Sequence, residues 1–203
     1  MSAPPKPSMR LAAFAFDEGV LGALPPGWKT EGTQQRGPLA TWEVRAEADA
    51  PSRPNALTLT KTNHASGGTF NLCWTDRVRF EDGRVEVALR ANGGEADQGG
   101  GPIWRVLDKD NYYVCRANPL ENNVRVYYVV HGSRTELASA DATLPSHQWH
   151  TIAVEQHGDH IVCFLNGAKL LEATDHHLPR PGGVGVWTKA DAATSFDDLE
   201  VTQ

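Results

Sequence analysis

Hydrophobic and polar residues alternate with a period of two along much of the chain. In residues 84–91, RVEVALRA, aliphatic side chains alternate with Arg and Glu, as expected for a strand with one buried face. Other runs rich in Val, Ile and aromatic residues are expected to form strands of the same kind. These runs are residues 124–130, 150–156, 160–165 and 183–189.

Turn signals separate these runs at short intervals, and no segment shows the sustained apolar stripe of an amphipathic helix. Asn166-Gly167 is the strongest hairpin signal, because both residues tolerate the positive φ angles of a type I′ turn. Regular short strands indicate a sandwich or barrel. We predict an all-β fold of two antiparallel sheets, with one domain over residues 11–203 and a disordered Pro-rich tail over residues 1–10.

Composition limits the kinds of partner. At 203 residues and 40% hydrophobic content, the chain is long enough to bury one sizeable core. A net charge of −6 argues against nucleic acid or an anionic membrane as the main partner. No apolar run approaches the roughly 18 residues that a membrane span needs. The sequence leaves the oligomeric state open.

The N-terminal region lacks the pattern of a signal peptide. Its apolar run from Leu11 to Phe16 is short, and Asp17 and Glu18 follow at once. A cytoplasmic location is therefore expected, unless a leader has been removed, in which case the protein is expected to be periplasmic or secreted.

The three cysteines are expected to be packing residues. Cys73, Cys115 and Cys163 are widely spaced, each within an apolar run, and they form no metal-binding pattern with histidine. Buried cysteine behaves as a small hydrophobic residue and its thiol is generally inert.

Residues 99–129 combine one Trp, four Tyr and three Arg in two runs joined by a short loop. If Cys115 and Ala117 point into the core, the alternate positions point to the other side of the sheet. Rings can stack on a sugar while Arg and Asn hydrogen-bond its hydroxyls, so this face is predicted to bind a saccharide. The alternative is a solvated face with cation–π contacts. The predicted face carries Tyr112, Arg116, Asn118, Arg125 and Tyr127, with Trp104 or Arg105 from the preceding strand.

Three segments resemble a known family. In residues 148–175, a Trp is followed by an alternating strand, Gly-Asp, and a strand ending in Asn-Gly-x-x-Leu. This order resembles the paired strands of concanavalin A-like and laminin G-like jelly rolls. Residues 16–32 and 181–201 resemble the two ends of a bacterial branch of that superfamily, the 3-keto-disaccharide hydrolase-like, or glycosyl-hydrolase-related, family. The resemblance implies a jelly-roll sandwich with a concave face.

The resemblance also implies a particular chemistry. The paired carboxylates on one strand that jelly-roll glucanases use are absent, so ordinary glycosidase chemistry is not expected. A 3-keto sugar instead has an acidic proton at C2, which one base can remove while other groups stabilise the enolate. The candidate bases are His64, Glu121 and Asp97, and Arg105 and Arg116 could hold the enolate oxygen. The alternative for His64 is a loop histidine in a Gly/Ser turn, and the alternative for Glu121 is a carboxylate at a hairpin tip, each without a catalytic role.

Three functions stay open at this point. The first is a hydrolase or lyase acting on a 3-keto disaccharide or glycoside at the sheet face. The second is a non-catalytic carbohydrate-binding module, and the third is a structural or protein-interaction sandwich. If Arg116 binds sugar, Arg116→Ala is expected to weaken binding without unfolding the protein.

The glycines of residues 99–101 and the acidic residues near the chain ends carry two further expectations. Three successive glycines allow a close backbone approach at a site rim, or form a simple turn. The alternation breaks at Asp197-Asp198, which predicts a β-bulge. Jelly-roll ends lie together in the resembled superfamily, so a structural Ca²⁺ held by some of Asp17, Glu18 and Asp198 is predicted. The alternative is that the Asp197 and Asp198 carboxylates are solvated or bonded to turn amides.

Overall fold

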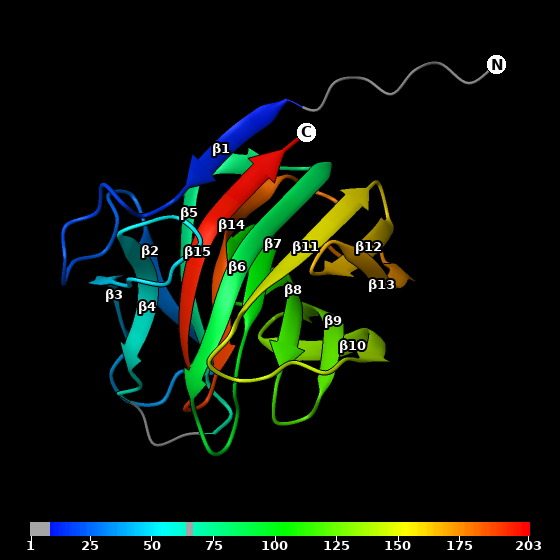
Figure 1. The fold of residues 1–203 in the computed structure, drawn as a ribbon. Helices are drawn as coiled ribbons and strands as arrows, with labels where there is room; N and C mark the ends of the chain where they lie inside the picture. The colour runs from blue at the N-terminus through cyan, green and yellow to red at the C-terminus, as the bar shows by residue number, and fades with distance from the viewer. Residues whose placement is uncertain (1–8, 64–66) are drawn as a thin grey trace.

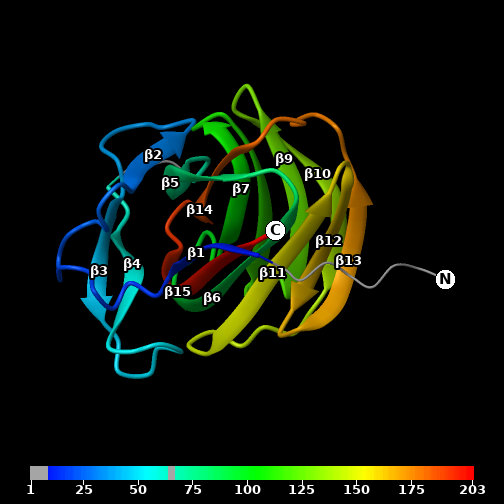
Figure 2. The same ribbon diagram turned by 90° about the horizontal axis from the view of Figure 1, so that it is seen from above.

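The protein folds as two antiparallel β-sheets packed face to face (Figures 1 and 2). The computed structural model describes residues 9–63 and 67–203, and these residues form fifteen strands and no helix. The predicted all-β sandwich is therefore confirmed. A membrane-spanning helix is likewise not found in the described part of the chain.

One sheet has eight strands. Its order is β13-β12-β11-β6-β15-β4-β3, and β1 pairs with β15 beside this path. Its strands are β1 (Arg10–Phe14), β3 (Thr41–Ala46), β4 (Asn55–Lys61), β6 (Gly83–Gly93), β11 (Trp149–His157), β12 (His160–Leu165), β13 (Ala168–Thr174) and β15 (Ala193–Thr202).

The other sheet has seven strands and carries most of the densely aromatic and basic stretch. Its order is β10-β9-β8-β7-β14-β5-β2. Its strands are β2 (Lys29–Thr33), β5 (Phe70–Phe80), β7 (Gly101–Asp108), β8 (Asn111–Asn118), β9 (Asn123–Val130), β10 (Ser133–Asp141) and β14 (Gly182–Lys189).

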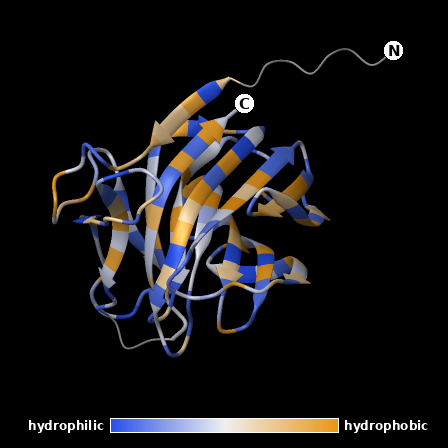
Figure 3. Ribbon diagram, viewed as in Figure 1, coloured by the Kyte–Doolittle hydropathy of each residue, from blue (hydrophilic) through white to orange (hydrophobic). Residues whose placement is uncertain are grey.

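The facing sides of the two sheets form the main hydrophobic core. On β6 the predicted alternation is confirmed, because Val85, Val87 and Leu89 lie in this core. Figure 3 shows the resulting bands of hydrophobic and hydrophilic residues along the strands. The cysteines are free and buried, as predicted, and burial raises the pKa of the Cys73 thiol. Their packing role follows from this burial.

The hairpin predicted at Asn166-Gly167 joins β12 to β13. Both residues have positive φ, 49° for Asn166 and 80° for Gly167. A type I′ turn needs positive φ at both central positions, so the sequence pair determined the register of this hairpin.

The two ends of the chain lie side by side in the eight-stranded sheet. Strand β1 pairs with β15, with Phe14 opposite Leu199. Arg10, which the sequence analysis assigned to the tail, is the first residue of β1. The predicted bulge is also present, since the β15 register shifts after Asp197 and Asp198 has a φ of 48°.

Candidate functional site

A second apolar cluster covers the side of the seven-stranded sheet that faces away from the core, here called the outer face. Strands β8 and β9 divide as their alternation predicts: Tyr113 and Cys115 lie in the main core, whereas Tyr112 and Tyr127 lie on the outer face. The outer cluster comprises Phe70, Leu72, Trp74, Ile103, Val106, Tyr112, Val114, Tyr127, Val129 and Trp187.

The seven-stranded sheet curls around this outer face. Strands β10 and β5 are separated by four intervening strands, which in a flat sheet would put them about 24 Å apart. Yet the guanidinium of Arg134 on β10 lies 4.9 Å from the ring centre of Phe70 on β5. Beyond β2, Gln34 Nε2 also donates to the Gly132 carbonyl between β9 and β10, at 2.9 Å. The sheet therefore forms a cup, whose curvature can be followed in Figure 2.

The rings on the floor of the cup are packed against one another. Tyr112 is fully buried, and its hydroxyl lies 2.9 Å from Thr33 Oγ1 and accepts a hydrogen bond from Trp187 Nε1 at 3.2 Å. Tyr127 is only 3% exposed. Both tyrosines lie on the predicted face, but neither offers a free ring surface on which a pyranose could stack.

Trp104 does not lie on the outer face. It is fully buried in the main core, where its ring stacks on Tyr113 at 5.5 Å and its Nε1 donates to Gln156 Oε1 at 2.6 Å. Strand β7 instead presents Ile103 to the outer face. The expectation for Trp104 was wrong because neighbouring residues of a strand point to opposite sides.

Arg105 also lies away from the outer face. It has a φ of 47° within a register irregularity of β7, and such a bulge re-aims a side chain. Its Nε donates to the Glu81 carbonyl at 2.9 Å, and its Nη1 donates to the Leu178 carbonyl at 3.0 Å. Arg105 therefore ties loops together and does not reach the cluster described next.

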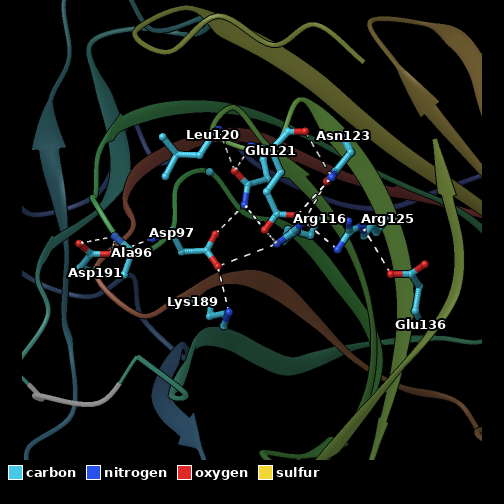
Figure 4. Close-up of polar contacts among 12 residues, drawn as sticks. Ala96, Asp97, Arg116, Leu120, Glu121, Asn123, Arg125, Glu136, Lys189 and Asp191 are labelled. Atoms are coloured by element: carbon cyan, nitrogen blue, oxygen red, sulfur yellow. Dashed lines mark hydrogen bonds and ion pairs between the residues drawn. The ribbon is translucent and has the colours of Figure 1, made fainter. Parts of the chain in front are cut away.

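Polar side chains gather on the outer face at the end of β8 (Figure 4). Arg116 is only 1% exposed. Its Nη2 donates to Glu121 Oε2 at 3.0 Å and to Asn123 Oδ1 at 2.9 Å, and its Nη1 lies 3.9 Å from Asp97 Oδ2. Its Nε is buried without a hydrogen-bond partner. This guanidinium therefore retains one N–H without an acceptor, which a ligand could reach only if neighbouring side chains moved.

Glu121 bridges two arginines that lie directly opposite each other. Arg116 and Arg125 are cross-strand partners of β8 and β9, an arrangement in which like charges repel. Glu121 Oε2 lies 3.0 Å from Arg116 Nη2 and 3.3 Å from Arg125 Nη1. The Arg116 hydrogen bond is the main cause that lowers the Glu121 pKa to about 2. Such a carboxylate is a weak base at neutral pH.

The pKa of Asp97 is shifted in the opposite direction from that of Glu121. It is 2% exposed, and its Oδ1 accepts a hydrogen bond from Asn118 Nδ2 at 2.9 Å. Its Oδ2 lies 3.3 Å from Nζ of Lys189, the last residue of β14. Burial raises the pKa of Asp97, although Arg116 and Lys189 oppose the shift. A carboxylate with a raised pKa is a stronger base than an ordinary aspartate.

The loop that carries Asp97 is fixed by its backbone. The Asp191 carboxylate accepts hydrogen bonds from the amides of Glu95 and Asp97, at 2.7 and 3.0 Å. A Cβ on Gly100 would lie 2.1 Å from the Trp187 carbonyl oxygen. The predicted close backbone approach at these glycines is confirmed, and it brings the Asp97 loop against the end of β14.

The cluster contains residues that the sequence did not single out. Lys189 could have been identified, because it shares the alternation phase of Trp187 on a predicted strand. Arg134 and Asp191 gave no comparable signal, since only the curl and the loop packing bring them here. His64 lies outside the described residues.

The predicted calcium ligands do not form a cluster. Asp17 Oδ1 accepts a hydrogen bond from the backbone N–H of Asn55 at 3.1 Å. The side chains of Glu18 and Asp198 are exposed. Asp197 Oδ2 accepts a hydrogen bond from the backbone N–H of Ser52 at 2.9 Å. Burial raises the pKa of Asp197 to about 6. Among the described residues, no three His, Cys, Asp or Glu side chains are placed to hold a metal ion.

The calcium site stays a prediction that melting curves can test. An ion bound only by the folded state raises the melting temperature in step with its concentration. If the site exists, millimolar calcium should raise the melting temperature above that measured in EDTA. Coincident curves would remove the site.

Solved structures of low sequence identity share this fold. A carbohydrate-binding module of family 66 from Bacillus subtilis matches with a TM-score of 0.64 and 18% identity, covering 85% of this chain and 93% of that one. A non-specific endo-β-1,3(4)-glucanase of glycoside hydrolase family 16 matches with a TM-score of 0.64 and 13% identity, covering 100% and 93%. Domain 4 of an extracellular arabinanase from Geobacillus stearothermophilus, in complex with arabinotriose, matches with a TM-score of 0.62 and 12% identity, covering 97% and 93%. The fold is thus a jelly roll.

Sequence comparison gives the family. No curated protein matches the chain. Residues 22–202, however, match the model of the 3-keto-α-glucoside-1,2-lyase-like domain, which agrees with the resemblance inferred from the two ends of the chain. Since this match spans most of the sequence, the chain belongs to the family of 3-keto-α-glucoside-1,2-lyase-like domains.

Proposed function

We propose that this domain cleaves a 3-keto glycoside by elimination at the outer face of its seven-stranded sheet. The observation that carries the proposal is the setting of Asp97, a buried carboxylate of raised pKa with Lys189 and Arg116 beside it. A base next to cations suits a reaction in which a proton leaves carbon and negative charge develops on a nearby oxygen.

In the proposed reaction, an Asp97 carboxylate oxygen takes the proton from C2 of the 3-keto sugar. The electron pair of the C2–H bond moves toward the C3 carbonyl and places negative charge on its oxygen. When this enolate collapses, a double bond forms between C1 and C2, and the bond from C1 to the glycosidic oxygen breaks. The leaving oxygen takes up a proton, and addition of water across the double bond would complete a net hydrolysis.

Arg116 and Lys189 would stabilise the enolate oxygen. Arg116 Nε is a buried donor without a partner. Once neighbouring side chains move to admit the sugar, it could donate to this oxygen without giving up its bonds to Glu121 and Asn123. Lys189 is partly exposed and lies over Asp97. It would have to swing aside for C2 to approach the carboxylate, and its ammonium group could then follow the developing charge.

The arrangement suits catalysis better than recognition by ring stacking. A binding module that stacks sugars needs exposed aromatic faces, and Tyr112 and Tyr127 are buried. In the part of the chain that the structure describes, four buried groups on this face have no hydrogen-bond partner, and three of them are charged: Asp97 Oδ2, Arg116 Nε and Arg134 Nη1, beside the neutral Tyr127 hydroxyl.

The test is an assay on a 3-keto disaccharide and its unoxidised parent in deuterated water. We expect the 3-keto compound alone to release a monosaccharide and an unsaturated 3-keto sugar. Residual substrate should carry deuterium at C2, because the base exchanges its proton with solvent. Binding without products or exchange would make the domain a carbohydrate-binding module. Absence of any response to either sugar would favour an interaction domain.

A further inference from the structure

Among the residues that the structure describes, Arg134 has no charged or hydrogen-bonding partner. Its guanidinium carbon lies 4.3 Å from the ring centre of Tyr127, 4.9 Å from Phe70 and 5.7 Å from Trp187. Its Nη1 is buried without an acceptor, and no hydrogen bond or ion pair among the described residues uses its guanidinium. The three rings thus hold a cation in place on the outer face, and its buried Nη1 has no acceptor.

This arrangement is electrostatically incomplete. Burial lowers the pKa of Arg134, and the nearby Arg116 lowers it further, whereas Asp97 acts in the opposite direction. Aromatic faces attract a guanidinium, but the group has five N–H donors that need acceptors. Arg134 is only partly buried, and the part of a charge that is removed from water normally needs a partner.

Each neighbouring basic side chain has a carboxylate partner, which Arg134 lacks within residues 9–63 and 67–203. Lys189 lies 3.3 Å from Asp97, and Arg116 lies 3.0 Å from Glu121. Arg125 has two carboxylates, Glu121 at 3.3 Å and Glu136 at 3.5 Å. Four basic side chains therefore face three carboxylates, and within the described residues Arg134 is the one left over.

We propose that Arg134 binds the carboxylate of a uronic-acid-type sugar, so that the substrate of this domain is an anionic glycoside. The inference rests on the proposed function, because it assumes that the sugar lies on the outer face. Arg134 then fixes the acidic sugar, while Arg116 Nε remains for the enolate oxygen. The planar guanidinium fork matches a carboxylate in shape. One surplus positive charge also suits a monoanion better than a phosphate dianion.

The test compares two sugars that differ in one group. Methyl glucuronide and methyl glucoside differ only in a carboxylate or a hydroxymethyl group at C5. Binding of each to the wild-type protein is measured by calorimetry at low and at physiological salt. We expect the glucuronide to bind at least tenfold more tightly, and its advantage to shrink as salt rises.

Two variants assign the preference to Arg134. Arg134→Met keeps an apolar side chain over the rings but removes the charge, so the preference should fall to within about twofold and the fold should persist. Arg10→Gln removes an exposed arginine on β1, far from the face, and should keep the wild-type preference. Melting curves of both variants check folding independently.

The remaining outcomes each decide the question. Equal affinity for the two sugars, or a preference that survives in Arg134→Met, would overturn the proposal. Equal binding of acetate would mean that the site takes any small anion, and tighter binding of glucose 6-phosphate would replace the carboxylate by a phosphate; both overturn it too. If the glucuronide binds as expected but no 3-keto glycoside is cleaved, the proposed elimination fails while the assignment of Arg134 stands.

Discussion

Asp97→Asn should lower kcat on a 3-keto disaccharide by roughly 10²- to 10⁴-fold, the usual contribution of a general base. Asparagine has nearly the same shape and can still accept the hydrogen bond from Asn118, but it cannot take a proton from C2. In the wild type, kcat/KM should fall as the pH drops through the pKa of Asp97, which burial raises above its usual range. The variant should lack this acid limb. The measurement is a pH profile of product release together with deuterium exchange at C2.

Two other variants make the assignment of the base specific. Glu121→Gln should keep kcat within about tenfold, because the low pKa of Glu121, about 2, makes it a weak base. His64→Gln tests the candidate outside the described residues. If Asp97→Asn retains activity and His64→Gln loses it together with the acid limb, His64 is the base and Asp97 is not.

Local sequence patterns predicted most of the fold. The alternation in residues 84–91, the Asn166-Gly167 pair and the slip at Asp197-Asp198 each depend on neighbouring residues, and each is found where expected. The same alternation separated Tyr112 from Tyr113 correctly. It could not show that the outer face is itself packed, because that depends on the curl of a seven-stranded sheet.

The polar site was predicted only in part, for a related reason. Arg116, Asn118 and Asp97 lie within the dense stretch or just before it, so their chemistry could be recognised from the sequence. Lys189 and Asp191 come from a strand and loop about ninety residues away. Alternation places Lys189 on the face of Trp187, but no local pattern shows that it meets Asp97, and Asp191 has no such signal. Trp104 and Arg105 were misplaced because strand phase and a bulge decide where adjacent side chains point.

Because Arg116 is buried, its substitution is expected to change the stability of the fold as well as sugar binding. From the sequence, Arg116→Ala should weaken sugar binding and leave the fold intact. In the structure Arg116 is 1% exposed and neutralises both Glu121 and Asp97. Loss of stability would therefore lower binding even if Arg116 never touched the sugar, and the two effects must be measured separately.

Arg116→Ala should lower the free energy of unfolding by about 3–5 kcal/mol, the cost of removing one partner from a buried ion pair. Asp97 would then be left with Lys189 alone as its cation, and the space of the side chain would be empty. Arg125→Ala is the matched control, since Arg125 lies directly opposite and shares Glu121, but its side chain is 32% exposed. It should lose no more than about 1 kcal/mol, as exposed pairs do. Urea unfolding at neutral pH measures both, and equal losses would mean that burial of Arg116 does not set its contribution.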